Sequence, residues 1–176
     1  MLSVFYRLNE FMVNKVAEYE LIVKQITAII SNEPDIIANM ANISAILFEQ
    51  LTDVNWVGFY RVSSDKVNKL EELILGPFQG KVACIRIPFN KGVCGTAASS
   101  KKTMRVANVH EFSGHIACDT LSNSEIVIPL IINDQVIAVL DIDSPIFDRF
   151  DTDDQVGLEN IINVFENIII QHGVLN

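Results

Sequence analysis

Three cysteines are the residues of this chain whose chemistry stands out first. Cys84, Cys94 and Cys118 are 10 and 24 positions apart, and no two of them form a Cys-x-x-Cys pair. An odd number of cysteines cannot close entirely into disulfides, which argues against a disulfide-stapled secreted scaffold. A thiolate is a strong nucleophile, whereas a buried free cysteine behaves as a small hydrophobic residue. The residue types alone leave thiol redox chemistry and core packing as alternatives.

The sequence around each cysteine favours chemistry. Cys84 opens an expected strand, Cys94 precedes an Ala/Ser-rich helical stretch, and Cys118 lies in an expected loop over residues 114–120. Reactive groups gather in loops and at element ends, and a helix N-terminus would favour a Cys94 thiolate. A zinc site formed by the three cysteines and His115 is an alternative, although structural zinc ligands usually occur in close pairs.

Three acids form a second group of candidates, Glu125, Asp141 and Asp143. Strand side chains alternate, so Asp141 and Asp143 share one face, and Asn133-Asp134 predicts a tight hairpin between their strand and that of Glu125. A regular two-residue turn sets Glu125 opposite Ile142, and only a bulge or bend would bring it to the face of the aspartates. Three carboxylates that meet would retain a proton and could act as a general acid. The alternative is a solvated strand end.

The elements that must position these residues follow from hydrophobic periodicity. Helical spacing runs from residue 20 to residue 51, with two helices meeting near Ser31–Asp35. A last helix has a capping-box start at Thr152–Gln155 and ends at Gly173. Between them the sequence predicts six strands, at Asn55–Val62, Leu73–Phe78, Cys84–Phe89, Thr103–Val109, Glu125–Ile132 and Gln135–Asp143. This order predicts an α+β domain with a central antiparallel sheet and the N- and C-terminal helices packed on one side.

Composition limits the class of protein. Of the 176 residues 49% are hydrophobic and 20% are charged, which suits one domain with a substantial core. The net charge of −9 argues against binding to nucleic acid or to an anionic membrane. The first twenty residues do not resemble a signal peptide, and no apolar stretch has the length of a transmembrane helix. We therefore expect a cytoplasmic protein with reduced thiols.

With these residues in place, the chain resembles the free methionine-(R)-sulfoxide reductases, enzymes built on a GAF domain. The resembling segments run in order through nearly the whole chain, and they are NWVGFY (55–60), LILGPFQG (73–80), AC (83–84), KGVCGT (91–96), GHIACD (114–119), NSEI (123–126) and VLDIDS (139–144). A generic GAF sensor would share the fold and the last motif, whereas the three cysteines in these contexts are specific to the reductases. The resemblance implies a single GAF domain over residues 1–176, matched from about 14 to 172, with residues 1–12 as an N-terminal extension.

The resemblance also implies a role for each candidate. Cys118 would attack the sulfoxide sulfur, Cys84 would be the principal resolving cysteine, and Cys94 an auxiliary thiol. The family's substrate-site carboxylates match Glu125, Asp141 and Asp143. A proton held among these three carboxylates would serve as the acid of the reaction, and we place Glu125 among the catalytic residues and both aspartates among the substrate-binding ones. Aromatic residues near the family's pocket match Trp56 and Tyr60, for which core packing is the alternative.

The implied reaction is the reduction of free L-methionine-(R)-S-oxide to L-methionine, with thioredoxin as the reductant and with no metal or organic cofactor. The apolar faces of the terminal helices allow a homodimer. Two other functions use the same features: a GAF sensor that binds a small ligand without catalysis, and a thiol peroxidase.

Overall fold

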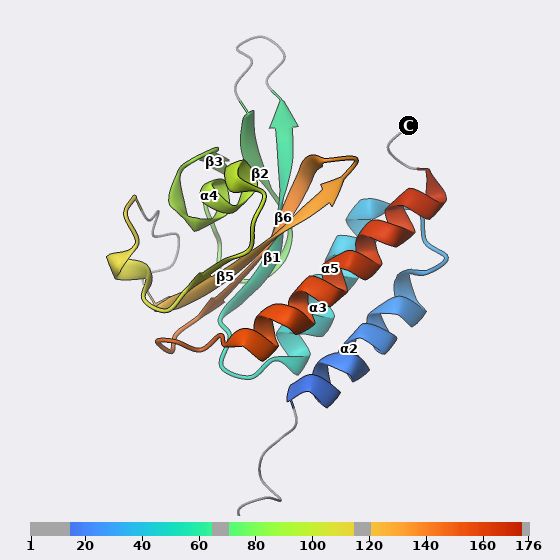
Figure 1. Ribbon diagram of the computed structural model, residues 1–176, viewed down its shortest axis with the longest axis horizontal. Coiled ribbons are helices and arrows are strands. Elements are labelled where there is room, and N and C mark those ends of the chain that lie inside the picture. The colour runs from blue at the N-terminus through green and yellow to red at the C-terminus, as the bar shows by residue number, and fades with distance from the viewer. Residues whose placement is uncertain (1–14, 65–70, 115–120, 174–176) are drawn as a thin grey trace, which may run out of the picture.

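A six-stranded antiparallel sheet with strand order β3-β2-β1-β6-β5-β4 forms the centre of the computed structural model, which describes residues 15–64, 71–114 and 121–173 (Figure 1). In chain order the elements are α2 (Lys15–Ile30), α3 (Ile36–Gln50), β1 (Trp56–Ser64), β2 (Glu71–Gly80), β3 (Arg86–Pro88), α4 (Gly92–Ser100), β4 (Met104–Val106), the 3-10 helix η1 (Val109–Glu111), β5 (Ser124–Ile132), β6 (Gln135–Ser144) and α5 (Thr152–His172). The predicted α+β class is confirmed. The N-terminal extension expected over residues 1–12 lies outside the described residues.

One face of the sheet carries the larger hydrophobic core, which α3 and α5 cover, and α2 packs against these two helices (Figure 1). Alternate residues of the central strands point to these helices, namely Val57, Phe59, Ile126, Ile128, Leu130, Ala138, Leu140 and Ile142. Burying these apolar side chains stabilises the domain and fixes the direction of every residue between them. The predicted packing of the N- and C-terminal helices on one side is confirmed. Among the described helices, none is both long and apolar enough to cross a membrane.

The start of α5 differs by one residue from the predicted capping box. Asp151 is the N-cap and accepts hydrogen bonds from the backbone N–H groups of Asp153 and Asp154, while the Asp154 carboxylate accepts from the Asp151 N–H at 2.9 Å. The box predicted from Thr152 is therefore wrong, because the carboxylate of Asp151 satisfies the free N–H groups of the first turn. The helix ends at Gly173 as expected, with a left-handed φ of 63°.

Helix α2 begins at Lys15, five residues before the expected start, because its first turn is tied to the start of α5. Lys15 Nζ lies 2.7 Å from carboxylate oxygens of both Asp151 and Asp154. The Tyr19 hydroxyl donates to Asp154 at 2.9 Å, and Arg149 pairs with the same carboxylate at 3.2 Å. Asp154 is almost fully buried, and these donors compensate the loss of its hydration.

The other face of the sheet is covered by the short helix α4 (Figure 1). This helix approaches the sheet closely, and a Cβ on Gly95 would lie 2.3 Å from the carbonyl oxygen of Pro88. Its buried residues include Val93, Cys94, Ala97 and Ala98, which form a second, smaller core with residues of β1, β5 and β6. All the candidate residues of the described strands lie on this second face.

The β5–β6 hairpin contains the irregularity on which the position of Glu125 depends. Asn133 and Asp134 form the turn with positive φ angles of 50° and 61°, and the regular register begins as expected with Ile132 opposite Gln135. The register then shifts between Leu130 and Ile131, so that Glu125 lies opposite Asp143 instead of Ile142. A bulge adds one residue to one strand and turns all later side chains to the opposite face.

The edge strands are shorter than predicted. β3 includes only Arg86–Pro88, so Cys84 lies in the loop before it, and β4 includes only Met104–Val106. The predicted strands Cys84–Phe89 and Thr103–Val109 are therefore too long. An edge strand has a partner on one side only. Single backbone hydrogen bonds, from Leu75 N–H to the Ile85 carbonyl and from Phe89 N–H to the Glu71 carbonyl, flank the short pairing of β3.

Candidate active site

Glu125 of β5 and Asp141 of β6 are buried on the sheet face that α4 covers. Both residues are only 6% exposed, although carboxylates are almost never buried unless they are paired with another group. Asp141 lies opposite Val127 and Gly58, and Asp143 lies opposite Glu125 and Trp56, so the three acids share one face. The predicted convergence of the acids is thus found, and the bulge supplies the turn that it required.

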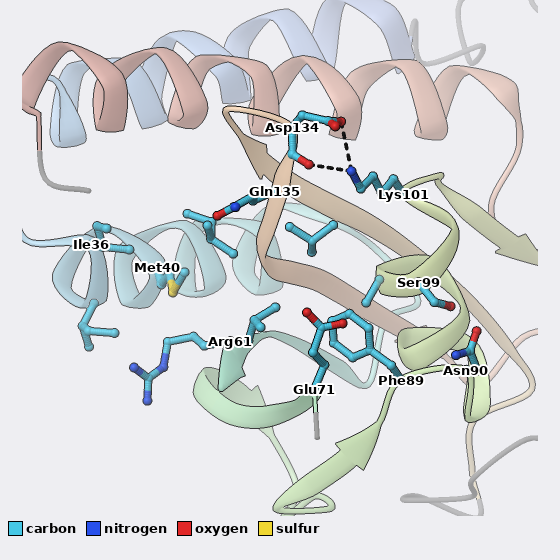
Figure 2. A pocket seen from close by; sticks show the side chains of 15 residues that line it. Ile36, Met40, Arg61, Glu71, Phe89, Asn90, Ser99, Lys101, Asp134 and Gln135 are labelled. Carbon is cyan, nitrogen blue, oxygen red and sulfur yellow. Dashed lines mark hydrogen bonds and ion pairs between the residues drawn. The ribbon is translucent and has the colours of Figure 1, made fainter. Parts of the chain in front are cut away.

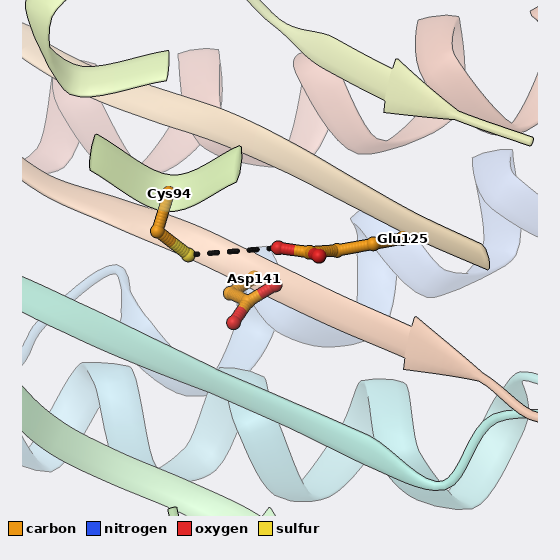
Figure 3. Close-up of side chains that lie close together, drawn as sticks. All are labelled: Cys94, Glu125 and Asp141. Carbon is orange, nitrogen blue, oxygen red and sulfur yellow. Dashed lines mark hydrogen bonds between the residues drawn. The ribbon is translucent and has the colours of Figure 1, made fainter. Parts of the chain in front are cut away.

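Cys94, in the first turn of α4, points from above onto the buried carboxylates (Figure 3). Its thiol is free and buried, and Sγ donates a hydrogen bond to Glu125 Oε1 at 3.8 Å. Ligand-type atoms of Cys94, Glu125 and Asp141 all lie within 4.8 Å of one another. The structure therefore brings together two of the predicted acids and one of the predicted thiols, from three separate elements.

Burial of this cluster favours its protonated forms. Burial raises the pKa of Asp141 to about 6, although contact with Cys94 and Glu125 partly opposes the shift. Burial, together with the negative charges of Asp141 and Asp143, raises the pKa of Glu125 well above its usual range. Two carboxyl groups in such contact share a proton, which makes the pair a source of acid catalysis near neutral pH.

Cys94 does not have the activated thiol that its place at a helix N-terminus suggested. Burial and the adjacent charges of Asp141 and Glu125 raise the pKa of its thiol well above the usual value. These effects outweigh the helix dipole, whose contribution falls off within a turn. Cys94 is therefore a protonated hydrogen-bond donor to the carboxylates in this arrangement.

Trp56 and Tyr60 form an aromatic wall beside the acids and hold the loop that carries Cys84. The Trp56 ring stacks on Phe78 at 5.3 Å and on Tyr60 at 5.8 Å between centroids. Trp56 Nε1 donates to the Lys81 carbonyl at 3.1 Å, and the Tyr60 hydroxyl donates to the Cys84 carbonyl at 3.1 Å. Their polar atoms thus fix the backbone on both sides of residues 82 and 83, a positioning role that the sequence did not indicate.

Gly58 is a residue whose contribution sequence reasoning missed. The Trp56 ring lies across it, and a Cβ at this position would lie 2.4 Å from Phe78 Cβ and 2.5 Å from Trp56 Cη2. A glycine between two aromatic residues of one strand face is itself a signal that a ring or backbone approaches closely. The aromatic wall requires the absence of a side chain here.

Replacing Gly58 by alanine is therefore expected to displace the Trp56 ring and to destabilise the domain by about 1–3 kcal/mol. Trp56 is the single tryptophan of the chain, so its fluorescence and near-UV circular dichroism report the displacement directly. Gly114→Ala is the matched control, because a Cβ there meets nothing within 4 Å and only its left-handed φ of 79° is strained. An unchanged tryptophan signal in Gly58→Ala would contradict the role of this glycine.

The remaining two cysteines differ in what the structure describes. Cys84 is half-buried and disulfide-bonded, in a loop whose neighbours Val82 and Ile85 are 88% and 69% exposed. Cys118, predicted as the nucleophile, and His115 lie outside the described residues. A sulfur in a disulfide is not a thiolate ligand, so this arrangement of Cys84 offers no support for the zinc site of three cysteines and His115.

A cavity of 860 Å³ lies at the opposite end of the sheet, between α3, α4 and the β5–β6 turn (Figure 2). Its charged groups include Lys101, which donates to the Asp134 carboxylate at 3.0 Å, and its lining among the described residues includes none of the candidate residues. The Ser99 hydroxyl, which also lines it, donates to the Gly95 carbonyl at 2.9 Å. The cavity is therefore separate from the acid–thiol cluster.

Comparison with known proteins identifies relatives of similar length. The sequence model of the GAF domain family matches residues 35–169 of this chain. The free methionine-R-sulfoxide reductase of Escherichia coli is 47% identical over 156 residues, which cover 89% of this chain and 91% of that protein. The protein of the same name from Saccharomyces cerevisiae is 46% identical over 130 residues, 71% of each chain.

Solved structures give the same result. The structure of fRMsr of Staphylococcus aureus in complex with substrate is 50% identical, with a TM-score of 0.79, and the match covers 86% of this chain and 95% of that chain. The free methionine-R-sulfoxide reductase of Neisseria meningitidis in complex with its substrate is 41% identical, with a TM-score of 0.83, over 91% of this chain and 93% of that chain. These similarities confirm the resemblance that the sequence motifs indicated.

Proposed function

Because this chain belongs to the free methionine-R-sulfoxide reductase family of GAF-domain proteins, we propose that it reduces free L-methionine-(R)-S-oxide to L-methionine. The observation that supports this most directly is the buried cluster of Cys94, Glu125 and Asp141, in which carboxyl groups retain a proton inside the domain. Sulfoxide reduction needs such a proton, because the oxygen must be protonated before it can leave as part of a sulfenic acid.

In the proposed reaction the Cys118 thiolate attacks the sulfoxide sulfur while Glu125 delivers a proton to the oxygen. The S–O bond of the sulfoxide breaks as its protonated oxygen passes to the Cys118 sulfur, so the sulfoxide is reduced to the thioether of methionine and Cys118 is oxidised to a sulfenic acid. Asp141 shares the proton with Glu125 and returns the pair to its protonated state with a proton from water. Geometry supports Glu125 in this role, because its carboxylate is buried and in contact with Cys94.

The proposed basis of substrate recognition is the negative charge that remains in the cluster. Asp141 and Asp143 lie on one face with Glu125, and a carboxylate there would bind the ammonium group of a free amino acid. Trp56 and Tyr60 would contribute the apolar wall for the side chain of the substrate, while their polar atoms hold the loop of Cys84.

The proposed cycle ends with a disulfide. The Cys84 thiol condenses with the Cys118 sulfenic acid, which forms the sulfur–sulfur bond and releases water, and thioredoxin then reduces the bridge to two thiols by exchange. Support comes from the half-buried loop of Cys84, where the exposed side chains of Val82 and Ile85 offer an apolar surface to a reductant. Such a cycle requires the reducing conditions of the cytoplasm, which is our proposed location.

We further propose a homodimer through the helical layer. The groove between α2 and α5 is lined partly by apolar side chains, which include Val16 and Val156, each 52% exposed, and partly by polar ones such as Lys24 and Asn163. Apolar groups gathered in one groove are typical of interaction sites, whereas scattered ones are ordinary surface.

The test is methionine release from separate R and S sulfoxides, free and within a peptide, with thioredoxin as reductant. We expect turnover of the free R form, with the peptide-bound and S forms slower by about 100-fold or more, because each lacks contacts that the site provides. Omitting thioredoxin is the control and should end the reaction after the first turnover. Binding without turnover would identify a sensor instead, and faster consumption of peroxide than of sulfoxide would identify a peroxidase.

A further inference from the structure

The cluster of Cys94, Glu125 and Asp141 has a second chemical property besides acidity. Its three donor atoms come from α4, β5 and β6 and converge within 4.8 Å of one another. They are one sulfur and two carboxylate oxygens, and all three residues are buried on the same side of the sheet (Figure 3). The rigid elements on either side hold the three donors in place, as a metal site requires.

Asp141 supplies an independent observation. Its oxygen Oδ1 is buried without a hydrogen-bond partner, although the residue is only 6% exposed and its carboxyl group faces the cluster. A buried acceptor without a partner costs free energy, and bound cations are a recognised partner for buried carboxylates. The cluster therefore has capacity to bind a positively charged ligand in addition to the contacts that it makes.

We propose that Cys94, Glu125 and Asp141 form a binding site for Zn²⁺ and similar thiophilic divalent cations. A zinc ion about 2.3 Å from sulfur and about 2.0 Å from oxygen separates the two donors by about 3.5 Å in a tetrahedron. The observed distance of 3.8 Å between Cys94 Sγ and Glu125 Oε1 is close to this separation. Zn²⁺ binding displaces two protons to solvent, that of the Cys94 thiol and that shared by the Glu125 and Asp141 carboxyl groups, and leaves a fourth position open for water.

The donor set also predicts which cations bind. A thiolate favours zinc and cadmium, whereas magnesium and calcium prefer sites made entirely of oxygen. Three protein donors with an open position are the arrangement of zinc sites that keep a water or substrate as fourth ligand, while closed structural sites have four protein ligands.

The consequence for activity rests on the proposed function. The same carboxyl groups would deliver the catalytic proton and bind the substrate ammonium group, so a bound Zn²⁺ would remove both capabilities at once. Zinc would then act as a reversible inhibitor that competes with free methionine sulfoxide and is reversed by a chelator.

The binding experiment is independent of activity. It uses the full chain with Cys84→Ser and Cys118→Ser, so that Cys94 is the single remaining thiol. We expect this protein to bind one Zn²⁺ by equilibrium dialysis, and to show a sulfur-to-cobalt charge-transfer band on addition of Co²⁺. Adding Cys94→Ser should abolish the band and weaken zinc binding by about 100-fold or more, since even outer-shell partners contribute about 10- to 100-fold.

Two further variants separate the site from adventitious binding. Asp141→Asn should weaken zinc binding comparably, whereas Asp134→Asn, at the exposed hairpin turn, should leave it unchanged. Circular dichroism checks that each variant is folded. Failure of the single-thiol protein to bind Zn²⁺, or a cobalt band that persists without Cys94, would overturn the proposal. Zinc binding without inhibition of the unmodified enzyme would retain the site and overturn its regulatory role.

Discussion

The Cys118→Ser protein is expected to release no methionine from free methionine-(R)-sulfoxide, whereas Cys84→Ser is expected to complete one turnover and then stop. The first variant lacks the proposed nucleophile, and a serine hydroxyl at neutral pH is a far weaker one, so a loss of about 10⁴-fold or more follows. The second retains the nucleophile but lacks the thiol that would convert its sulfenic acid to a disulfide. Rapid quenching with quantification of methionine per chain measures both.

Mass spectrometry distinguishes how each variant stops. Cys84→Ser should accumulate oxidised Cys118, which a sulfenic-acid reagent labels, and Cys118→Ser should accumulate no oxidised cysteine. The wild-type protein without thioredoxin is the matched control, because it should also release methionine only once but should end as a disulfide. Equal multiple turnover by both variants would refute the assignment of attacker and resolver.

The sequence predicted the central sheet and the helices near both ends of the chain well, because the local spacing of apolar residues indicates each of them. The middle parts of β5 and β6 are aliphatic, with a turn of Asn133-Asp134 between the two strands, and the turn chemistry alone sets the register at Ile132 and Gln135. The sequence did not predict the bulge in this hairpin, and indicated only that Glu125 would need one to reach the face of the aspartates. Its presence depends on which side chains the helices on one face and α4 on the other require, and this is a tertiary effect.

The parts that could not be predicted are those held by side chains. Before Ile85, whose carbonyl still accepts from Leu75 of β2, the loop is held by the Trp56 and Tyr60 donors, so Cys84 lies outside the strand that its neighbours suggested. Cys94 shows the same limit. Its place at a helix start argued for a thiolate, yet burial beside Glu125 keeps the thiol protonated.

Glu125→Gln is expected to lower kcat by about 10²- to 10³-fold while KM changes little, because glutamine keeps the size of the side chain but has no acidic proton. Glu49→Gln, on the exposed side of α3, is the matched control and should behave as wild type. Steady-state kinetics with saturating thioredoxin separate kcat from KM. An effect on KM alone would assign Glu125 to substrate binding and would contradict acid catalysis.

The same substitution should raise stability at alkaline pH, which a purely structural role of Glu125 would not produce. Burial raises the folded-state pKa of Glu125 and brings that of Asp141 to about 6, both above the usual carboxyl values. The folded protein therefore binds more protons than the unfolded chain. The stabilisation from these groups is fully present below the ordinary carboxyl pKa and declines as pH rises through the raised values.

Glutamine removes one of the two coupled charges, so the stability of Glu125→Gln should decline much less with rising pH. Thermal denaturation from about pH 5 to about pH 8 measures it, and a gain of about 1 kcal/mol at the higher pH would appear as about 2–4 °C in Tm. A variant that is slower yet more stable would show that the wild-type fold tolerates charge repulsion in order to keep a proton at Glu125. If Tm changes with pH in the same way for the wild type and for Glu125→Gln, Glu125 does not hold a proton in the folded protein.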